Sequence, residues 1–159
     1  MGRFQGSRFA HKRDGTFKLT LAPDERALLA ALPDQLESLL TADDPGLAGK
    51  RLFPPAYPDD AERNGEYQRL MRDELVRGRV EALAIVRDTI AAERLTADQL
   101  DAWIRAINDA RLVLGTLLDV SEEQDPLDVD PESADVHQRI AYVVLSGIVA
   151  DAVDALAAT

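Results

Sequence analysis

The spacing of apolar residues predicts a mainly α-helical chain. Apolar side chains recur every three or four residues, the period of one helix face, over residues 23–41, 64–94, 97–119 and 132–157. Pro33 interrupts the first stripe and removes a helical hydrogen bond, so we expect a kink in that helix. These segments predict a single domain over residues 1–159, built as a compact bundle of four to five helices.

Two of these segments carry further signals. Thr96 and Gln99 have the spacing of a capping box, which starts the third helix. Beyond Ala110 the sequence LVLGTLL is apolar on nearly every side, so we expect the second half of that helix to be central. The last segment is rich in Val and Ile, which have modest helix propensity, so its stability must come from burial in the core or in an interface. Its longest apolar run, residues 140–150, contains Ser146 and Gly147 and is too short to cross a bilayer.

Residues 7–21 follow the pattern of a β-hairpin instead. The sequence TFKLTL alternates apolar and polar residues, as a half-buried strand does. Asp14-Gly15 predicts a two-residue turn with positive φ at both positions. Because an isolated two-stranded hairpin is marginal in water, we expect this one to lie on the helices or to pair with another chain.

Two segments read as loops. Residues 42–63 are rich in Pro and Gly, and residues 119–135 contain eight acidic residues and no basic ones. In the second loop Asp128, Asp130 and Glu132 alternate as oxygen ligands of a divalent ion would, but the glycine and terminal glutamate of a calcium-binding loop are missing. We expect a solvated acidic linker there, with ion binding as the alternative.

The charge is distributed unevenly. The chain carries a net charge of −11, while residues 1–21 hold five basic residues against Asp14 alone, a local +4 that leaves −15 for the rest. An acidic body repels nucleic acid, and a basic arm this small gives weak, salt-sensitive attachment, so any DNA contact should be weak or indirect. The basic residues that we expect to contact phosphates or a partner are Arg8, Lys12, Arg13 and Lys18.

The sequence contains none of the common catalytic or cofactor-binding motifs. The chain has no cysteine, and neither a phosphate-binding glycine loop nor a dinucleotide fingerprint is present. His11 and His137 have no histidine partner at metal-binding spacing, and Ser146 sits among apolar residues with no base nearby in sequence. We therefore expect no catalytic residue, no cofactor and no metal.

One polar cluster interrupts the apolar pattern in the middle of the third helix. Asn108, Asp109 and Arg111 lie among apolar neighbours, although Asn and Asp are poor residues for a helix interior. A buried charge needs an opposite charge, so we expect a structural network, with contact to a ligand or partner as the alternative. The partners that we expect on the neighbouring helix are Arg69, Arg72, Asp73 and Glu74.

The sequence DAWIRAINDARLVLGTLLDV in the same helix resembles a signature of a family widespread in actinobacteria, classified as a domain of unknown function. Further similarity lies in LFPPAYPDD and EYQRLMRDEL, which begin at residues 52 and 66. The residues that carry the motif are Trp103, Ile104, Ile107, Leu112, Gly115, Tyr57 and Tyr67.

The family includes the actinomycete oxidative-stress regulator, which works with a sigma factor on transcription, and its genes often lie beside that of the adaptor of the Clp protease. The resemblance thus implies a non-catalytic, cytoplasmic regulatory protein with a sigma factor or RNA polymerase as partner. The alternative is an adaptor or structural homodimer linked to Clp-type proteolysis. Redox sensing through cysteines, proposed for the family, cannot operate in a chain that has none.

Overall fold

The computed structural model describes residues 7–41, 59–118 and 136–159, except the side chains of residues 68–70 and 72. It confirms the predicted fold class, mainly α with an N-terminal antiparallel sheet. Its elements in chain order are β1 (Phe9–His11), β2 (Phe17–Leu19), α1 (Pro23–Leu40), α3 (Ala61–Thr89), β3 (Arg94–Leu95), α4 (Ala97–Leu117) and α5 (Val136–Ala157).

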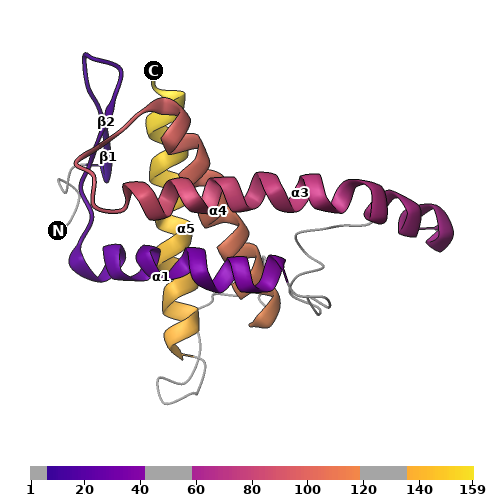
Figure 1. Ribbon diagram of the computed structural model, residues 1–159. Coiled ribbons are helices and arrows are strands. Elements are labelled where there is room, and N and C mark those ends of the chain that lie inside the picture. The colour runs from indigo at the N-terminus through magenta and orange to yellow at the C-terminus, as the bar shows by residue number, and fades with distance from the viewer. Residues whose placement is uncertain (1–6, 42–58, 119–135) are drawn as a thin grey trace.

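The helices form two crossed layers (Figure 1). In one layer α1 and α3 lie alongside each other; in the other α4 and α5 do, and α3 and α1 contact α4 where the layers cross. The N-terminal part of α3 extends beyond the other helices, and β1 contacts α5 at the opposite side of the molecule. One hydrophobic core receives side chains from both layers and from the sheet.

The predicted hairpin is present, but it is part of a three-stranded sheet of order β1-β2-β3. The prediction of a two-residue turn at Asp14-Gly15 is wrong. The amide of Gly15 donates to the Lys12 carbonyl and that of Lys12 to the Thr16 carbonyl, so the loop has three residues, with the positive φ of 86° at its last residue, Gly15. Three-residue loops of this kind are common in hairpins. Their last residue has a positive φ and forms a β-bulge, and glycine adopts that conformation without strain.

The boundaries of α3 differ from the predicted residues 64–94. The helix begins at Ala61, where the Asp60 carboxylate accepts a hydrogen bond from the Arg63 amide at 3.1 Å. It ends at Thr89, and the carbonyl of the C-cap residue Ile90 accepts a hydrogen bond from the Arg26 side chain of α1. Arg94 and Leu95 then pair with β2. The sequence did not predict this short strand, because no glycine or proline separates it from the helix.

The two stretches predicted to be most deeply buried are covered only in part. The capping box of α4 is confirmed, since the Gln99 amide donates to the Thr96 hydroxyl at 3.2 Å and the Thr96 amide to the Gln99 side chain at 2.9 Å. At the other end of α4, Leu117 is 67% exposed, so the prediction of a central second half is wrong there. In α5, Ile140 and Val153 are 46% and 45% exposed. Each helix is buried on the side that faces its neighbours, and these three side chains lie on sides that the described residues leave partly uncovered.

Pro33 lies buried inside α1 without ending the helix. The predicted loops, the acidic ion site and Tyr57 fall on residues 42–58 and 119–135, outside the described residues, as do residues 132–135 of the predicted last helix. Among the described helices, α5 is long and apolar enough by length and composition to cross a membrane, with a mean hydropathy of 1.8.

Candidate interaction site

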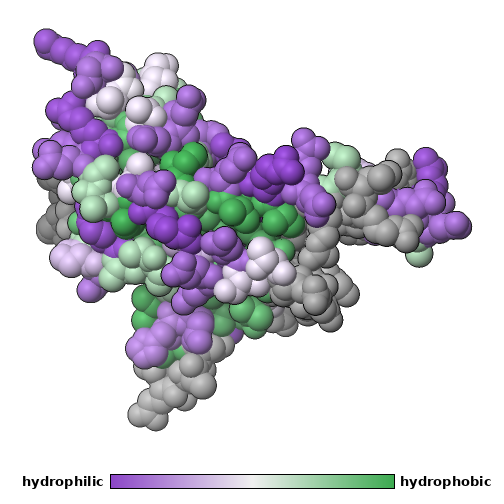
Figure 2. All heavy atoms as spheres, viewed as in Figure 1, coloured by the Kyte–Doolittle hydropathy of each residue, from purple (hydrophilic) through white to green (hydrophobic). Residues whose placement is uncertain are grey.

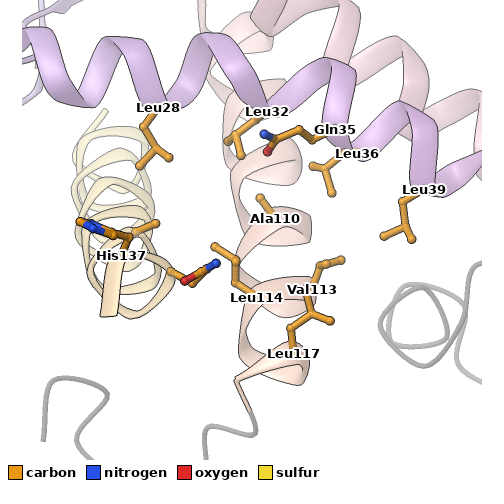
Figure 3. A pocket seen from close by; sticks show the side chains of 12 residues that line it. Leu28, Leu32, Gln35, Leu36, Leu39, Ala110, Val113, Leu114, Leu117 and His137 are labelled. Atoms are coloured by element: carbon orange, nitrogen blue, oxygen red, sulfur yellow. The ribbon is translucent and has the colours of Figure 1, made fainter. Parts of the chain in front are cut away.

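An open groove with a volume of about 460 Å³ lies between α1, the C-terminal half of α4 and the start of α5 (Figure 3). We call it the α1–α4 groove. Nine of its twelve lining residues are apolar and three are polar. The lining residues are Leu28, Leu32, Gln35, Leu36, Leu39, Ala110, Val113, Leu114, Leu117, His137, Gln138 and Ala141.

The leucine stripe of α1 divides between the core and this groove. Leu29 and Leu40 are almost fully buried, whereas Leu28 and Leu39 are half-buried at the two ends of the groove wall. Leu32 and Leu36 lie between them and are more than nine-tenths buried, so they form the floor. A single amphipathic stripe thus supplies both core packing and an apolar wall.

The opposite wall belongs to the second layer. Leu114 faces the start of α5 in Figure 3, while Val113 and Leu117 lie toward the end of α4. Leu117 is the most exposed large apolar side chain among the described residues. Figure 2 shows apolar surface below α1, where the ends of α4 and α5 emerge, with hydrophilic side chains around it. A single exposed leucine is ordinary, but one that continues an apolar groove makes that groove a candidate interaction site.

The chemistry of the groove favours binding over catalysis. His137 is the only ionisable residue among its lining residues, and Gln35 and Gln138 supply the other polar groups. No group of three or more His, Asp or Glu side chains in the described ranges could hold a metal ion. An open apolar groove with a few amide and imidazole groups suits the apolar face of a helix from another protein.

The motif residues of α4 pack inside the protein. Trp103 is fully buried, its indole N–H donates to the Thr89 hydroxyl at 2.7 Å, and the Phe9 ring meets it edge to face at 6.2 Å. Ile107 is also fully buried, whereas Ile104 and Leu112 are half-buried. Trp103 therefore joins α3, α4 and β1, which gives the motif a structural role.

Gly115, another residue of the motif, lies where α4 packs closely against α5. A Cβ atom added there would lie 3.2 Å from the Tyr142 ring of α5, so a side chain would press on the neighbouring helix. Glycine thus permits the close approach of α4 and α5. Tyr67 lies half-exposed on α3, away from this contact.

The polar cluster of α4 forms internal contacts. Asp109 pairs with Arg79 of α3 at 3.5 Å, and Arg111 donates to the Asn108 side chain at 2.7 Å. The partner of Asp109 is thus about two to three turns further along α3 than Arg69 and Arg72, whose side chains lie outside the description, while Asp73 and Glu74 are exposed. Burial raises the pKa of Asp109, although Arg79 and Arg105 oppose the shift.

The raised pKa of Asp109 predicts a pH-dependent effect of Asp109→Asn. The folded state binds this proton more tightly than the unfolded chain, so the wild type loses stability as the pH rises through that window. Asparagine stays neutral, so the free energy of unfolding of the variant, minus that of the wild type, should increase from about pH 4 to pH 7. Urea titrations at both pH values measure the difference. Asp101→Asn, at an exposed acid of the same helix, is the control, and an equal increase there would contradict the assignment.

Arg8 forms ion pairs within the protein. Its guanidinium contacts Glu25 of α1 and Asp151 of α5, each at 2.6 Å, and hydrogen bonding to Glu25 is the main reason that the pKa of Arg8 is raised. The Arg8 side chain is only 28% exposed. It links the N-terminal end of the sheet to one helix of each layer, while the expected contact of Arg8 with a phosphate or a partner stays a prediction.

The other basic residues of the hairpin are more accessible. Arg13 and Lys18 are exposed, and Lys12 and Lys18 line an open depression of about 430 Å³ beside Glu93 and Arg94. The Asp14 carboxylate pairs with Arg94 at 3.0 Å, so the one acidic side chain of the hairpin is neutralised by an arginine from outside it. These residues do not reach the α1–α4 groove.

Arg8→Ala should lower the free energy of unfolding by about 1–3 kcal/mol, because it removes charge-assisted hydrogen bonds from two partly buried carboxylates. Arg8→Lys keeps the charge but not the fork geometry, so it should lose less. Denaturant titrations of the wild type and both variants at neutral pH measure the three free energies of unfolding and show their order. Equal stability of wild type and Arg8→Ala would show that the contacts of Arg8 with Glu25 and Asp151 do not stabilise the fold.

The two histidines and Ser146 have no catalytic arrangement around them among the described residues. His11 lies against the Phe17 ring at 5.1 Å, and His137 is exposed at the edge of the groove. The Ser146 hydroxyl donates to the Tyr142 carbonyl one turn earlier at 2.8 Å. This bond satisfies the serine within its own helix, as expected for a packing residue.

Sequence reasoning missed the groove itself. Its leucines were visible as helix stripes, but only the crossing of the layers shows which of them stay uncovered. Comparison with known families gives a match to the model of a domain of unknown function, DUF2017, over residues 2–156. No curated protein and no solved structure is significantly similar to the chain. Because the family model covers nearly the whole sequence, the chain belongs to the DUF2017 family.

Proposed function

We propose that this chain is a non-catalytic regulatory protein that binds an amphipathic helix of a protein partner in the α1–α4 groove. The groove, with Leu117 67% exposed at its edge, carries the proposal. Its length along α1, from Leu28 to Leu39, corresponds to about three helical turns. A partner helix can place apolar side chains at i, i+3 or i+4 and i+7 along such a groove.

The charge of the chain favours a basic partner. A net charge of −11 raises the association rate with a positively charged surface and disfavours direct approach to DNA. Exposed basic residues occur on the hairpin, at Arg13 and Lys18, and also on α3 and α4, at Arg63, Arg77, Arg87 and Arg105, but over the chain the 29 acidic residues outnumber the 18 basic ones. Contact with nucleic acid would thus be secondary to the protein contact.

The resemblance to the actinomycete oxidative-stress regulator supplies the biological setting of the proposal. We infer a cytoplasmic role in a transcription-associated stress response, with a sigma factor or RNA polymerase as the protein that binds the groove. Since the chain contains no cysteine, an oxidative signal would have to arrive through that partner.

Affinity purification with the full-length chain from a lysate of its host at low salt tests the partner. We expect a sigma factor or RNA polymerase to be enriched over a bait of equal net charge. Enrichment of Clp components instead would favour the alternative, a proteolysis adaptor. If neither set of proteins is enriched, the proposed partner is wrong.

A further inference from the structure

α1 and α5 form two sides of the α1–α4 groove, yet each packs mainly on other elements. α1 lies against α3 and α4, and α5 lies against α4 and β1. At the groove, α1 supplies the leucine wall, while α5 supplies His137, Gln138 and Ala141. The distance between α1 and α5 thus depends less on direct packing of the two helices than on side chains that reach both.

Arg8 is such a side chain. Its Nη2 atom lies 2.6 Å from the Glu25 carboxylate of α1, and its Nη1 atom lies 2.6 Å from the Asp151 carboxylate of α5. The Nε–H group donates to the same Glu25 oxygen at 2.8 Å. Two donors of one rigid, planar guanidinium therefore point at α1 while a third points at α5, which holds the two carboxylates at a defined separation.

The backbone of α5 leaves room for the guanidinium at Gly147. A Cβ atom added at this position would lie 3.7 Å from Arg8 Nη1, which is ordinary van der Waals contact. Alanine would fit there, but a longer side chain that pointed the same way would take the place of the guanidinium. Gly147 and Asp151 are four residues apart and share one face of α5, so the small residue and the acid together receive Arg8.

Arg8 lies beyond the groove and is not among its lining residues. Glu25 lies one turn before Leu28, the first leucine of the groove wall, on the same face of α1. On α5, Asp151 lies about 15 Å along the helix from Ala141, the last α5 residue that lines the groove. An effect of Arg8 on the groove must therefore act through the position of α1 relative to α5.

Arg87 offers a comparison within the same protein. It contacts Asp34 and Glu37 of α1 at 2.9 and 3.0 Å, so it joins α1 to α3 inside one layer, whereas Arg8 joins α1 to α5 across the two layers. The Arg87 side chain is 43% exposed, against 28% for Arg8, so solvent screens its ion pairs more strongly. Both arginines hold two carboxylates, but only one of them spans the groove-forming helices α1 and α5.

We propose that Arg8 is a positioning residue, which holds α1 on α5 and thereby sets the opening of the α1–α4 groove for the helix that binds there. The identity of that helix rests on the proposed function, whereas the position of α1 is a property of the free chain. Without Arg8, α1 keeps its contacts with α3 and α4 but loses its link to α5. The end of the groove at Leu28 then moves relative to the start of α5.

The distance between two spin labels measures this position directly, because the chain has no cysteine and labels attach only where one is introduced. The label pair Ala31→Cys/Ile140→Cys joins exposed positions of α1 and α5. In Arg8→Ala the distance should shift or broaden by at least about 1–2 Å, the size of helix shifts at packed interfaces. Asp151→Ala cuts the link from the α5 side and leaves Arg8 on Glu25, so it should give the same change.

Arg87→Ala is the matched control, since it also removes two ion pairs of α1 but should leave the α1–α5 distance unchanged. A second label pair, Ala31→Cys/Glu81→Cys, reports the distance from α1 to α3 and should be the same in Arg8→Ala and wild type, which excludes general unfolding. An unchanged α1–α5 distance in Arg8→Ala or Asp151→Ala, or an equal change in Arg87→Ala, would overturn the proposal.

Capture of the partner measures the consequence for binding. The amount of sigma factor or RNA polymerase recovered per mole of chain should fall at least about threefold in Arg8→Ala and Asp151→Ala, an effect of the size expected when a residue acts on a site through another element. Recovery with Arg87→Ala should equal that of the wild type. If the wild type captures these proteins and Arg8→Ala captures them equally well, the positioning role of Arg8 is wrong.

The two kinds of failure are separable. If the wild type captures neither a sigma factor nor RNA polymerase, the proposed partner is wrong, while the spin-label distances of the free chain still decide whether Arg8 positions α1. An α1–α5 distance that does not respond to Arg8→Ala overturns the positioning role, whatever protein binds in the groove.

Discussion

Replacing Trp103 with alanine should lower the free energy of unfolding by about 3–5 kcal/mol. The indole is fully buried where α3, α4 and β1 meet, so its removal leaves a cavity and deprives Phe9 of its edge-to-face contact. The Thr89 hydroxyl loses a hydrogen-bond donor as well. A loss this large is a substantial fraction of the stability of a small domain.

Trp103→Phe is the matched variant. It keeps an aromatic ring against Phe9 but removes the indole N–H, while the Thr89 hydroxyl still donates to the Ile85 carbonyl at 2.5 Å. We expect it to lose about 1–2 kcal/mol. Because Trp103 is the only tryptophan, unfolding is followed by far-ultraviolet circular dichroism. If Trp103→Ala lowered the free energy of unfolding by less than about 1 kcal/mol, or by no more than Trp103→Phe does, the conclusion that Trp103 joins α3, α4 and β1 would be wrong.

Leu117→Lys should weaken binding of the groove partner at least about tenfold, because the ammonium group must lose water on the apolar surface. The fold should be unaffected: Leu117 is 67% exposed, and a basic residue at the C-terminal end of α4 is favourable to the helix dipole. The measurement is the partner recovered per mole of chain in an affinity purification.

Ala30→Lys supplies the control for this variant. Ala30 is exposed on α1, on the side away from the groove leucines, and the substitution adds the same charge. Full recovery of partner with Ala30→Lys and strong loss with Leu117→Lys is the expected pair of results. Equal recovery with both would show that the groove does not bind the partner.

Local signals in the sequence predicted the helices well. The capping box at Thr96 and the acidic start of α1 depend on neighbouring residues only, so they survive in the folded chain. The hairpin was predicted for the same reason. Its loop type was not, because Asp-Gly is compatible with both a two-residue turn and a three-residue loop that ends at glycine.

Features that depend on contacts between distant residues could not be predicted. At the end of α3 the Ile90 carbonyl accepts a hydrogen bond from Arg26, 64 residues away in sequence, and β3 is only two residues long. Likewise, the pairing of Asp109 with Arg79 depends on how α3 crosses α4. The motif around Trp103 could be identified from sequence, but its structural role required the positions of Thr89 and Phe9.

The claim that the α1–α4 groove binds a transcription protein is tested most directly by photo-cross-linking in cells. A p-benzoylphenylalanine residue placed at position 117 should form a light-dependent product with a sigma factor or a polymerase subunit, whereas the same residue at position 30 should form none. Equal products from both positions would contradict the proposed site. So would the absence of a product from position 117 while the wild-type chain still captures these proteins.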